Sequence, residues 1–361
     1  MTRREMVKGV YQILPNMSYG DAITNHVLVI KDILKELGYN TGVFSMNQDP
    51  RLSGLAQSYK DYRSLSSEDN ILIYHFSIGS EITDFFKTLP DKKMIVYHNI
   101  TPSHFFLGIN RMAEEDCRKG REELKGLVTL VDVALGVSEF NRLGLEEAGF
   151  KITGVLPIVL NDSFYSRKPN RRLLKMFNDG KVNLLHVGRI APNKKIEDVI
   201  RVFYFYNHKI NPASRLLIVG SDVNMENYAF GLKELSDGFG LGEVYFIGAA
   251  SIEELNACYR VAHLYICMSE HEGFCVPLLE AMYFGIPIIA YNSSGIPYTL
   301  GDAGMLVNEK NFEEIAEMVD ILVRDAEIRE KVIEGQRKRL EDFSRERLRE
   351  SLKEYLDRFE I

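Results

Sequence analysis

The feature that most constrains the fold of this chain is an alternation that runs along its whole length. Short apolar runs rich in Val, Ile and Tyr alternate with longer amphipathic segments. This alternation is typical of βαβ units, in which a helix follows each strand and returns the chain to the same end of a parallel sheet. The pattern therefore predicts an α/β fold.

The apolar runs place expected strands in both halves of the chain. In the first half they predict strands at 10–14, 41–45, 71–74, 94–97, 133–136 and 153–156. The first helix fits 21–37 and would end at Gly38, because glycine often follows the last turn of a helix. The second half predicts strands at 182–187, 216–219, 244–247, 263–268, 287–291 and 305–307. Each half is thus expected to form its own doubly wound sheet.

The length of 361 residues suits two domains of this kind. The alternation lapses after Ser166, in the basic stretch RKPNRRLLKMFNDGK, which has no strand signal. We therefore predict an N-terminal Rossmann-like domain at 1–168, a linker at 169–181 and a second Rossmann-like domain at 182–342. The final helix, 343–361, has its apolar residues on one face and is expected to pack back on the N-terminal domain.

Charge and cysteine content narrow the class of protein. A net charge of -7 argues against nonspecific binding to nucleic acid, so an anionic ligand would need a local basic pocket. The four cysteines show no CxxC spacing and are expected to be reduced structural thiols. The N-terminus does not resemble a signal peptide, and no window reaches the ~18 apolar residues that a membrane span needs. We expect a cytoplasmic protein.

Two cations follow the first strand of the second half, in LLHVGRIAPNKKIEDVI. Arg189 and Lys194 lie between the strand and a helix that starts near Ile196. Ligands of doubly wound sheets bind beyond the carboxyl ends of the strands. Two cations beside a helix N-terminus form a site for a phosphate or a diphosphate. A solvated basic loop is the alternative.

Two carboxylates flank a predicted helix start in SEHEGFCVPLLEAMYFGIPII. Pro277 suits the first helical position, so the helix is expected at 277–284, with Glu272 in the loop before it and Glu280 in its first turn. A continuous helix would separate the two acids by ~12 Å, whereas a loop followed by a turn can bring both to one cleft. Acids beside a diphosphate would accept hydrogen bonds from hydroxyls. For Glu280, a favourable charge near a helix N-terminus is the alternative.

These two motifs together resemble the retaining glycosyltransferases of family four, also called group 1. GRIAPNK is followed at the family's usual distance by SEHEGFCVPLLEAMYFGIPIIA, with GAASIEELNACYRVAHLYICMSE between them and GVSEFNR upstream. The likeness covers essentially the whole chain. It implies the GT-B fold, in which two Rossmann-like domains face each other across a cleft, with the acceptor side in the N-terminal domain and the nucleotide-sugar donor in the C-terminal domain.

The resemblance also implies roles for the charged residues. Arg189 and Lys194 would hold the donor diphosphate in place of a metal ion. Glu280 would bind the ribose diol, and Glu272 would lie against the transferred sugar. Neither a metal nor another cofactor is expected.

Backbone groups would complete the donor site on the same resemblance. The amides of Gly273, Phe274 and Cys275 would face the sugar hydroxyls and the distal phosphate. The backbone near Ile247 and Gly248 would meet the base.

The N-terminal half offers further candidates. Gly20 stands where the family has a glycine-rich loop that approaches the donor phosphates, although the usual glycine pair is incomplete here. Asp21 beside it is interpreted as a helix N-cap. His98 follows a strand, and in the resembling enzymes a histidine there faces the sugar near the reaction centre; a packed surface histidine is the alternative. His75 is a weaker candidate for the acceptor side.

The predicted function is a metal-independent, retaining transfer of a hexose from a nucleotide-diphosphate sugar to a hydroxyl of a glycan, lipid-linked or small-molecule acceptor, as in polysaccharide biosynthesis. The expected catalytic residues are His98, Glu272, Arg189 and Lys194. The alternatives are a nucleotide-sugar epimerase, a glycogen-synthase-like polymerase and a noncatalytic nucleotide-sugar binding protein. A Rossmann dehydrogenase is disfavoured because the strand-to-helix turns lack GxGxxG.

One segment raises the question of membrane contact. PSHFFLGINRMAEEDCRKGREELKGL combines the apolar residues 105–107 with several basic side chains, a combination that can meet a lipid-linked acceptor at an anionic membrane surface. The acids at 114–116 interrupt the basic stretch. A helix that faces the protein core is the preferred interpretation, and peripheral membrane contact is the alternative.

Overall fold

The computed structural model describes residues 9–359, which belong to two compact units. Unit 1 comprises Met1–His104, Met112–Asn161 and Phe343–Ile361, and unit 2 comprises Phe105–Arg111 and Asp162–Asp342. Each unit contains one parallel sheet with helices between its strands. The predicted α/β class, with a doubly wound sheet in each half, is confirmed.

The sheet of unit 1 has, within the described residues, seven strands in the order β3-β2-β1-β4-β5-β6-β7. They are β1 Gly9–Met17, β2 Val43–Gln48, β3 Gln57–Ser58, β4 Asn70–Phe76, β5 Lys92–Tyr97, β6 Val133–Gly136 and β7 Thr153–Val155. All but β3 coincide with a predicted strand. β3 escaped prediction because it is two exposed residues paired with β2 at the sheet edge, without an apolar run.

The helices of unit 1 connect these strands. They are α1 Ala22–Glu36, α2 Glu81–Lys87, α3 Arg111–Lys125, α4 Glu139–Ala148 and α14 Arg345–Asp357, with short 3-10 turns at Pro50–Leu52, Tyr59–Ser64 and Ser103–Phe106. The carboxylate of Asp21 accepts hydrogen bonds from the amides of Ile23 and Thr24 at 3.1 Å, so it caps α1 as predicted. The cap fixes where the helix begins after β1.

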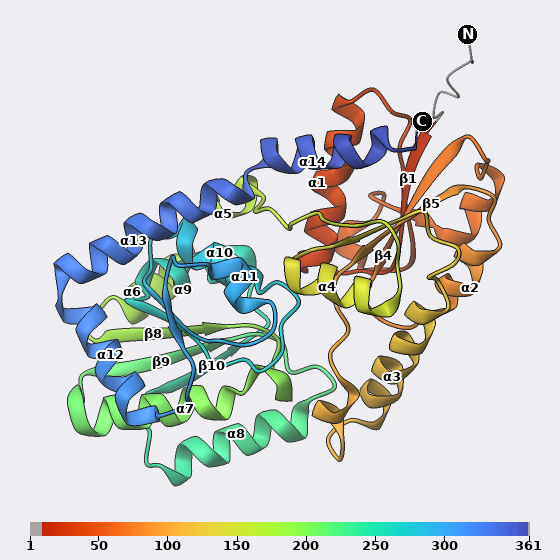
Figure 1. Cartoon of the computed structure of the whole chain (residues 1–361). Coiled ribbons are helices and arrows are strands. Elements are labelled where there is room, and N and C mark those ends of the chain that lie inside the picture. The colour runs from red at the N-terminus through yellow and green to blue at the C-terminus, as the bar shows by residue number, and fades with distance from the viewer. Residues whose placement is uncertain (1–8, 360–361) are drawn as a thin grey trace. The chain divides into compact units, whose positions relative to one another are not determined.

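The helix α14 belongs to unit 1 although it is last in sequence. Figure 1 shows it beside α1, and Arg345 forms an ion pair with Glu36 of that helix at 2.8 Å. The hydroxyl of Tyr355 accepts a hydrogen bond from the Val155 amide at 3.2 Å. Gly154 permits this approach, because a Cβ atom there would lie 2.2 Å from the same hydroxyl.

The sheet of unit 2 has, in the part of the chain that the structure describes, six strands in the order β10-β9-β8-β11-β12-β13. They are β8 Val182–Val187, β9 Ser214–Val219, β10 Val244–Gly248, β11 Leu264–Cys267, β12 Ile288–Tyr291 and β13 Met305–Val307, all of them near predicted positions. The order reverses between β8 and β11. A sheet of this kind binds ligands at such a switch point, beyond the carboxyl ends of the strands.

Unit 2 contains two helices, α5 Asp162–Tyr165 and α6 Arg171–Phe177, that precede the predicted start of the second domain at residue 182. Its other helices are α7 Ile196–Phe205, α8 Glu226–Gly238, α9 Ile252–Val261, α10 Val276–Tyr283, α11 Ile296–Leu300, α12 Phe312–Arg324 and α13 Ala326–Leu340, with short turns at Pro192–Lys194, Tyr206–Ile210 and Glu341–Phe343. Unit 2 starts at Asp162, where the first domain was expected to end at 168. The expected linker 169–181 lies within unit 2 and contains α6, whose cap is the side chain of Asn170.

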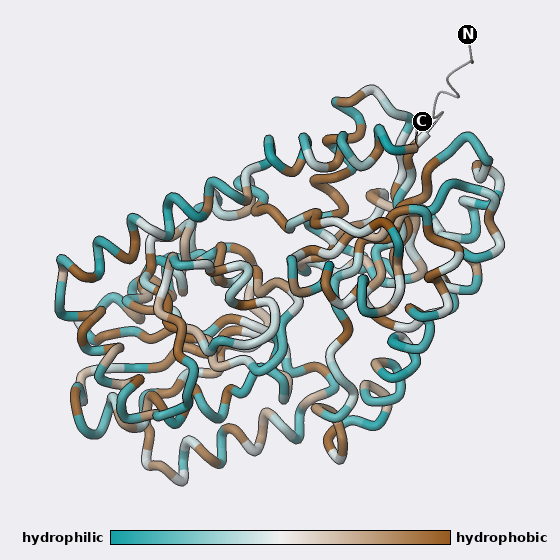
Figure 2. The backbone as a smooth tube through the Cα atoms, in the orientation of Figure 1, coloured by the Kyte–Doolittle hydropathy of each residue, from teal (hydrophilic) through white to brown (hydrophobic). Residues whose placement is uncertain are grey.

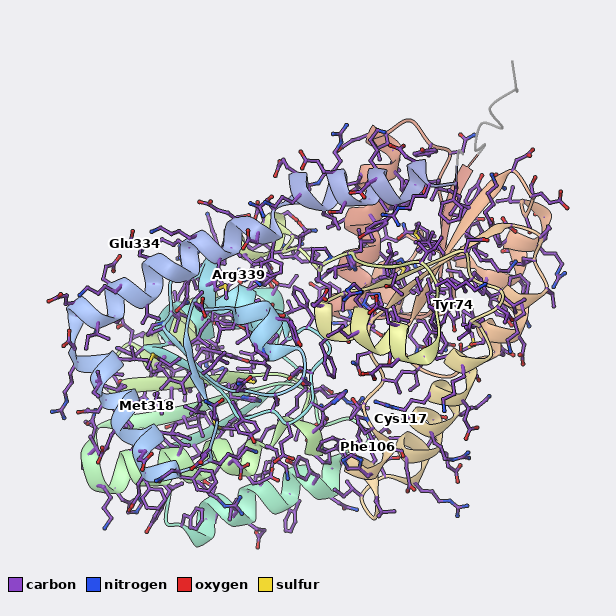
Figure 3. The ribbon with its side chains drawn as sticks, in the orientation of Figure 1. Tyr74, Phe106, Cys117, Met318, Glu334 and Arg339 are labelled. Atoms are coloured by element: carbon purple, nitrogen blue, oxygen red, sulfur yellow. The ribbon has the colours of Figure 1, made fainter. Side chains whose placement is uncertain are left out.

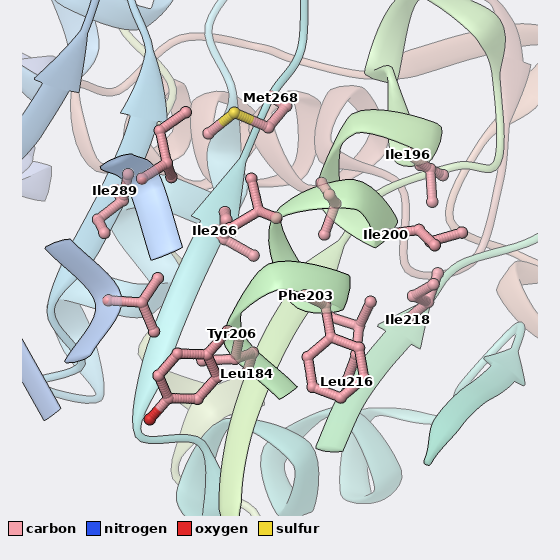
Figure 4. Packing of buried hydrophobic residues seen from close by; sticks show 14 of the residues in the cluster. Leu184, Ile196, Ile200, Phe203, Tyr206, Leu216, Ile218, Ile266, Met268 and Ile289 are labelled. Atoms are coloured by element: carbon pink, nitrogen blue, oxygen red, sulfur yellow. The ribbon is translucent and has the colours of Figure 1, made fainter. Parts of the chain in front are cut away.

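Apolar packing holds α7 on the sheet of unit 2. Figure 4 shows Phe203 of α7 beside Leu216 and Ile200 beside Ile218 of β9, and these side chains are fully buried. Burying each of them contributes roughly 1.5–3 kcal/mol relative to exposure. In Figure 2 the strands are mainly brown, whereas α3 and α13 are mostly teal, as expected for surface helices.

A polar contact holds α13 on unit 2. Arg339 lies on α13 (Figure 3), and its guanidinium donates to the carbonyl of Thr299 in α11 at 3.0 Å. This bond pairs a carbonyl near the carboxyl end of α11, a group that the helix itself leaves without a partner.

Candidate functional site

The loop between β8 and α7 is shaped by close backbone contact. A Cβ atom on Gly220, at the end of β9, would lie 1.8 Å from the carbonyl oxygen of Gly188, so only glycine fits there. Arg189 is exposed and donates to the carbonyl of Val223 at 3.2 Å. Lys194 lies five residues later, in the turn that precedes α7. The two predicted cations therefore both lie at the carboxyl end of β8.

The loop after β11 is fixed to its neighbours by hydrogen bonds. The amide of Glu270 donates to the carbonyl of Asn193 at 2.9 Å, and the Asn193 side chain donates to the carbonyl of His271 at 2.9 Å. The amide of Glu272 donates to the hydroxyl of Ser294 at 2.7 Å. These bonds join the loops that follow β8, β11 and β12, and they place Glu272 beside the basic loop.

Lys194 and Glu272 form a close ion pair at this point. The Nζ atom of Lys194 lies 2.7 and 2.6 Å from the two carboxylate oxygens of Glu272, whose side chain is only 8% exposed. Burial alone would lower the pKa of Lys194, but the Glu272 carboxylate outweighs it, and the pKa stays above 10.5. The lysine is therefore a permanent cation in a half-buried setting.

The helix α10 begins directly after this pair. Cys275 is its N-cap, in the left-handed conformation with φ 71°, and the carbonyl of Phe274 accepts a hydrogen bond from the Thr299 hydroxyl at 2.6 Å. The helix is broken between the two acids, as predicted. The prediction that Glu280 lies in the first turn is wrong: the helix starts at Val276, so Glu280 is its fifth residue and lies in the second turn.

Two tyrosines that sequence reasoning missed hold Glu280. The hydroxyl of Tyr165 donates to one carboxylate oxygen at 2.7 Å, and that of Tyr259 donates to the other at 2.5 Å. Burial raises the pKa of Glu280, and the two hydroxyl bonds act against this rise. Each carboxylate oxygen has a second lone pair, so the group can still accept from a ligand. Spacing gave no signal for Tyr165, which lies 115 residues away.

A buried histidine also lies near the basic loop. The Nδ1 atom of His186, on β8, is 3.0 Å from the carbonyl of Ile266. Because a carbonyl only accepts, Nδ1 carries the proton, and Nε2 is a lone-pair atom without a partner among residues 9–359. Burial lowers the pKa of His186 to about 4, so the ring is neutral at pH 7.

The candidates of the first half lie in unit 1. Gly20 has φ 77° and precedes the cap of α1. His98 follows β5, and its amide extends the strand pairing to the carbonyl of Phe76 at 2.9 Å. Its ring nitrogen Nε2 lies 3.0 Å from Nδ1 of His75, so the structure brings the two candidate histidines together. The ring of His26 from α1 lies beside these two rings, and its centroid is 5.6 Å from the centroid of the His98 ring.

A comparison with known families identifies the second half. Residues 172–339 match the family of Glycosyl transferases group 1. Over these residues the chain is similar to group 1 glycosyltransferases. This family is the one that the two motifs of unit 2 indicated, and the matched residues contain both of them.

Curated proteins similar to this chain are distant. An uncharacterized glycosyltransferase of Haemophilus influenzae is 27% identical over 63% of the chain, and the O-antigen chain mannosyltransferase B of Escherichia coli is 26% identical over 37% of it. The aligned regions span 61% and 34% of the length of these two proteins.

The fold of the chain is shared with solved structures. Anabaena HepE in complex with UDP and glucose superimposes with a TM-score of 0.77 and 16% identity, over 97% of this chain and 99% of that one. At this identity the likeness concerns the fold alone. It confirms the predicted GT-B architecture of two Rossmann-like domains.

Two groups of side chains in the described part of the chain could present three ligand atoms to a metal ion: His26, His75 and His98 in unit 1, and Cys267, Glu272 and Cys275 in unit 2. In the second group the ammonium of Lys194 already occupies both oxygens of Glu272. A hydrogen bond with Cys267, together with burial, raises the pKa of Cys275 well above 9.0. The cysteines of the described chain are buried thiols outside any disulfide, as predicted.

The segment considered for membrane contact contains α3. This helix buries Cys117, Gly120 and Leu124, and a Cβ atom on Gly120 would lie 2.6 Å from the amide of Gly79. The preferred interpretation, a core-facing helix, is therefore confirmed. Within residues 9–359 we find no helix with the length and apolar character that crossing a bilayer requires.

Proposed function

We propose that this protein is a glycosyltransferase that moves a hexose from a nucleotide-diphosphate sugar to an acceptor hydroxyl, with retention of configuration and without a metal. The observation that carries the proposal is the ion pair of Lys194 and Glu272, held where the loops after β8 and β11 are joined. It places a permanent cation and a hydroxyl-binding acid side by side at the switch point of the sheet.

The cations are suited to a diphosphate. Arg189 and Lys194 lie at the carboxyl end of β8, and the N-terminus of α10 begins four residues after Glu272. Such groups stabilise the charge that develops on a departing diphosphate. Lys194 takes the role that a divalent cation would otherwise have. The structure of HepE, solved with UDP and glucose, supports a donor of this class.

The acids are suited to the sugar hydroxyls of the donor. Glu280 keeps one lone pair on each oxygen beside its tyrosine bonds, enough to accept from both hydroxyls of a ribose diol. Glu272 is proposed to accept from the hexose. The backbone of Gly273, Phe274, Cys275 and Gly248 is proposed to line the rest of the donor site in unit 2. Gly20 and His98 of unit 1 stay candidates on the resemblance alone.

A front-face route fits the state of Glu272. An ammonium on both of its oxygens weakens the carboxylate as a nucleophile, so a covalent glycosyl intermediate is disfavoured. In the proposed step the bond from the anomeric carbon to the diphosphate oxygen breaks, and the bond to the acceptor oxygen forms on the same face. The acceptor proton passes to the departing phosphate oxygen. The name of the O-antigen mannosyltransferase relative supports a glycan as acceptor.

A thermal-shift panel of nucleoside diphosphates and their sugars tests the donor site. A ligand at 100 times its Kd stabilises the folded protein by about 2.7 kcal/mol, so one base should raise the Tm clearly above the others, with or without EDTA. The matching sugar donor is then incubated with glycan acceptors, and NMR of the product reports the anomeric configuration. Absence of any Tm shift, an inverted product or a requirement for metal would each contradict a part of the proposal.

A further inference from the structure

A chain of buried polar side chains crosses the sheet of unit 1. Gln12 lies in the middle of β1 and His75 near the end of β4, and both are fully buried. Gln12 pairs with Ile73 across the strands, and His75 pairs with Val96 of β5. Since paired residues of parallel strands point to the same face, Gln12, His75 and His98 all project from one side of the sheet.

Hydrogen bonds connect these side chains in series. The amide nitrogen of Gln12 lies 3.1 Å from the carbonyl of Val27 in α1, and its amide oxygen lies 2.9 Å from Nε2 of His75. The Nδ1 atom of His75 then lies 3.0 Å from Nε2 of His98. The series starts at a backbone carbonyl and ends at Nδ1 of His98, a buried atom without a partner among residues 9–359.

The carbonyl at the start fixes the direction of every bond. A carbonyl only accepts, so the amide nitrogen of Gln12 must face Val27, and the amide oxygen must face His75. That oxygen accepts from His75, so Nε2 of His75 carries the proton and its Nδ1 is bare. His98 must then donate from Nε2, which leaves its own Nδ1 as a lone pair.

Both imidazoles are neutral. Burial and the neighbouring ring of His26 lower the pKa of His75 well below 6.5, and burial and the rings of His75 and His26 do the same for His98. A neutral ring has one donor and one acceptor nitrogen, so the series determines which nitrogen of His98 accepts.

We propose that Gln12 and His75 are positioning residues that hold His98 as the Nε2–H tautomer, with its Nδ1 ready to accept a hydrogen bond from an uncharged hydroxyl of a ligand. The identity of that ligand as a sugar rests on the proposed function. The tautomer of His98 does not depend on the proposed function, because the hydrogen bonds of Gln12 and His75, which start at the carbonyl of Val27, determine it without any ligand.

His26, His75 and His98 could also form a metal site. In such a site Nδ1 of His75 and Nε2 of His98 would both have to bind the ion, but these two nitrogens lie at hydrogen-bond distance from each other, with one proton between them. Metal content of the purified chain decides between the two.

The test is nitrogen NMR of the full chain labelled at histidine, with the His98 signals assigned by His98→Gln. We expect the wild type to show a protonated Nε2 and a bare Nδ1. Gln12→Met removes both hydrogen bonds and should let the His98 ring populate both tautomers. Gln12→Glu with a protonated carboxyl group can donate to the carbonyl of Val27 and keep its other oxygen toward His75, so in that form it should retain the wild-type pattern.

Gln336→Met is the matched control, because Gln336 of unit 2 is equally buried and also donates to a backbone carbonyl, that of Ile286 at 2.8 Å. It should leave the His98 signals unchanged. With a transferable donor, Gln12→Met should lower kcat by about 10-fold to 100-fold, as loss of an outer partner of a functional histidine does, with little change in donor KM.

Three results would overturn the proposal: a protonated Nδ1 on His98 in the wild type, an unchanged tautomer in Gln12→Met, or one equivalent of metal that is lost on mutation of His26. If no nucleotide sugar is turned over, the NMR result still decides the tautomer, so failure of the proposed function is seen separately.

Discussion

The two units place polar clusters at the carboxyl ends of parallel strands, but the clusters differ in charge. Unit 1 presents an amide and imidazoles that are neutral, because burial lowers the pKa of His26 to about 3 and those of its two neighbours well below 6.5. Unit 2 presents Lys194, which stays charged because Glu272 lies on it. Burial disfavours the charged form of the histidines in unit 1 and of Lys194 in unit 2, but only Lys194 has a carboxylate partner that keeps it charged.

This difference shows that one topology prepares sites for different ligands. The fold determines where a ligand can lie, whereas the side chains at the strand ends determine whether it is charged. A charged cluster suits a diphosphate, and a neutral cluster suits hydroxyl groups. Each of the following predictions changes one cluster in a way that the other should not feel.

Removing the cation of unit 2 should have the largest effect. Lys194→Ala leaves the buried Glu272 carboxylate without its partner and should lower the free energy of unfolding by about 3 kcal/mol. Transfer should fall by a factor on the order of 10² to 10³, because one group that stabilises the departing charge is lost. Urea unfolding and donor turnover measure the two effects.

Lys181→Ala is the control for this change. Lys181 pairs with Glu243 in the same unit at 2.6 Å, but both side chains are about a third exposed, at 35% and 31%. Such a surface pair contributes about 0 to 1 kcal/mol, and it lies away from the switch point. Equal losses in the two variants would mean that Lys194 has no special role.

Acidification should lower the free energy of unfolding because of the neutral histidines of unit 1. An unfolded histidine binds a proton near pH 6.5, but His26 in the folded protein does so only at about pH 3, so between these values the unfolded state binds more protons. The free energy of unfolding must therefore fall as the pH drops through this window. Between pH 6.5 and 5 the loss from this one residue is about 1.5 kcal/mol.

Variants separate the two units in this measurement. His26→Phe should remove its share of the acid dependence seen in urea unfolding at pH 6.5 and 5. His186→Phe, in unit 2, should remove a contribution of the same sign whose window ends at about pH 4. If acidification stabilises the wild type, or if His26→Phe keeps the full dependence, the neutral state of the cluster is wrong.

The sequence predicted the strands well because nearly all of them are apolar runs, most of them followed by a helix. The missed strand β3 has two exposed residues and no such run. The stretch 169–181 was expected to be a linker without regular structure, but it contains α6, which the Asn170 side chain caps and whose one buried residue is Phe177. Local patterns reveal cores, and short elements that depend on one or two contacts escape them.

The sequence predicted only those residues of the candidate site that lie within the two motifs. Lys194 and Glu272 were both named, but their ion pair spans 78 residues and follows from loop contacts that no spacing shows. Gln12 and His26 gave a usable signal, since each is a polar residue within an otherwise apolar strand or helix face. Tyr165 gave none, because a tyrosine in a connecting segment has many ordinary explanations.

Glu280 is the exception to the contrast between the units, and it permits the finest test. Glu280 belongs to unit 2, but the side chains that donate to its carboxylate are neutral hydroxyls. In this respect it resembles the histidines of unit 1, whose partners are also neutral. Tyr165→Phe removes one of these bonds and should cost about 1 kcal/mol of unfolding free energy. It also leaves one carboxylate oxygen fully open to a ligand, so the affinity for the nucleoside diphosphate, measured by calorimetry, should not fall. A drop in affinity of tenfold with unchanged stability would mean that the Tyr165 hydroxyl itself contacts the ligand.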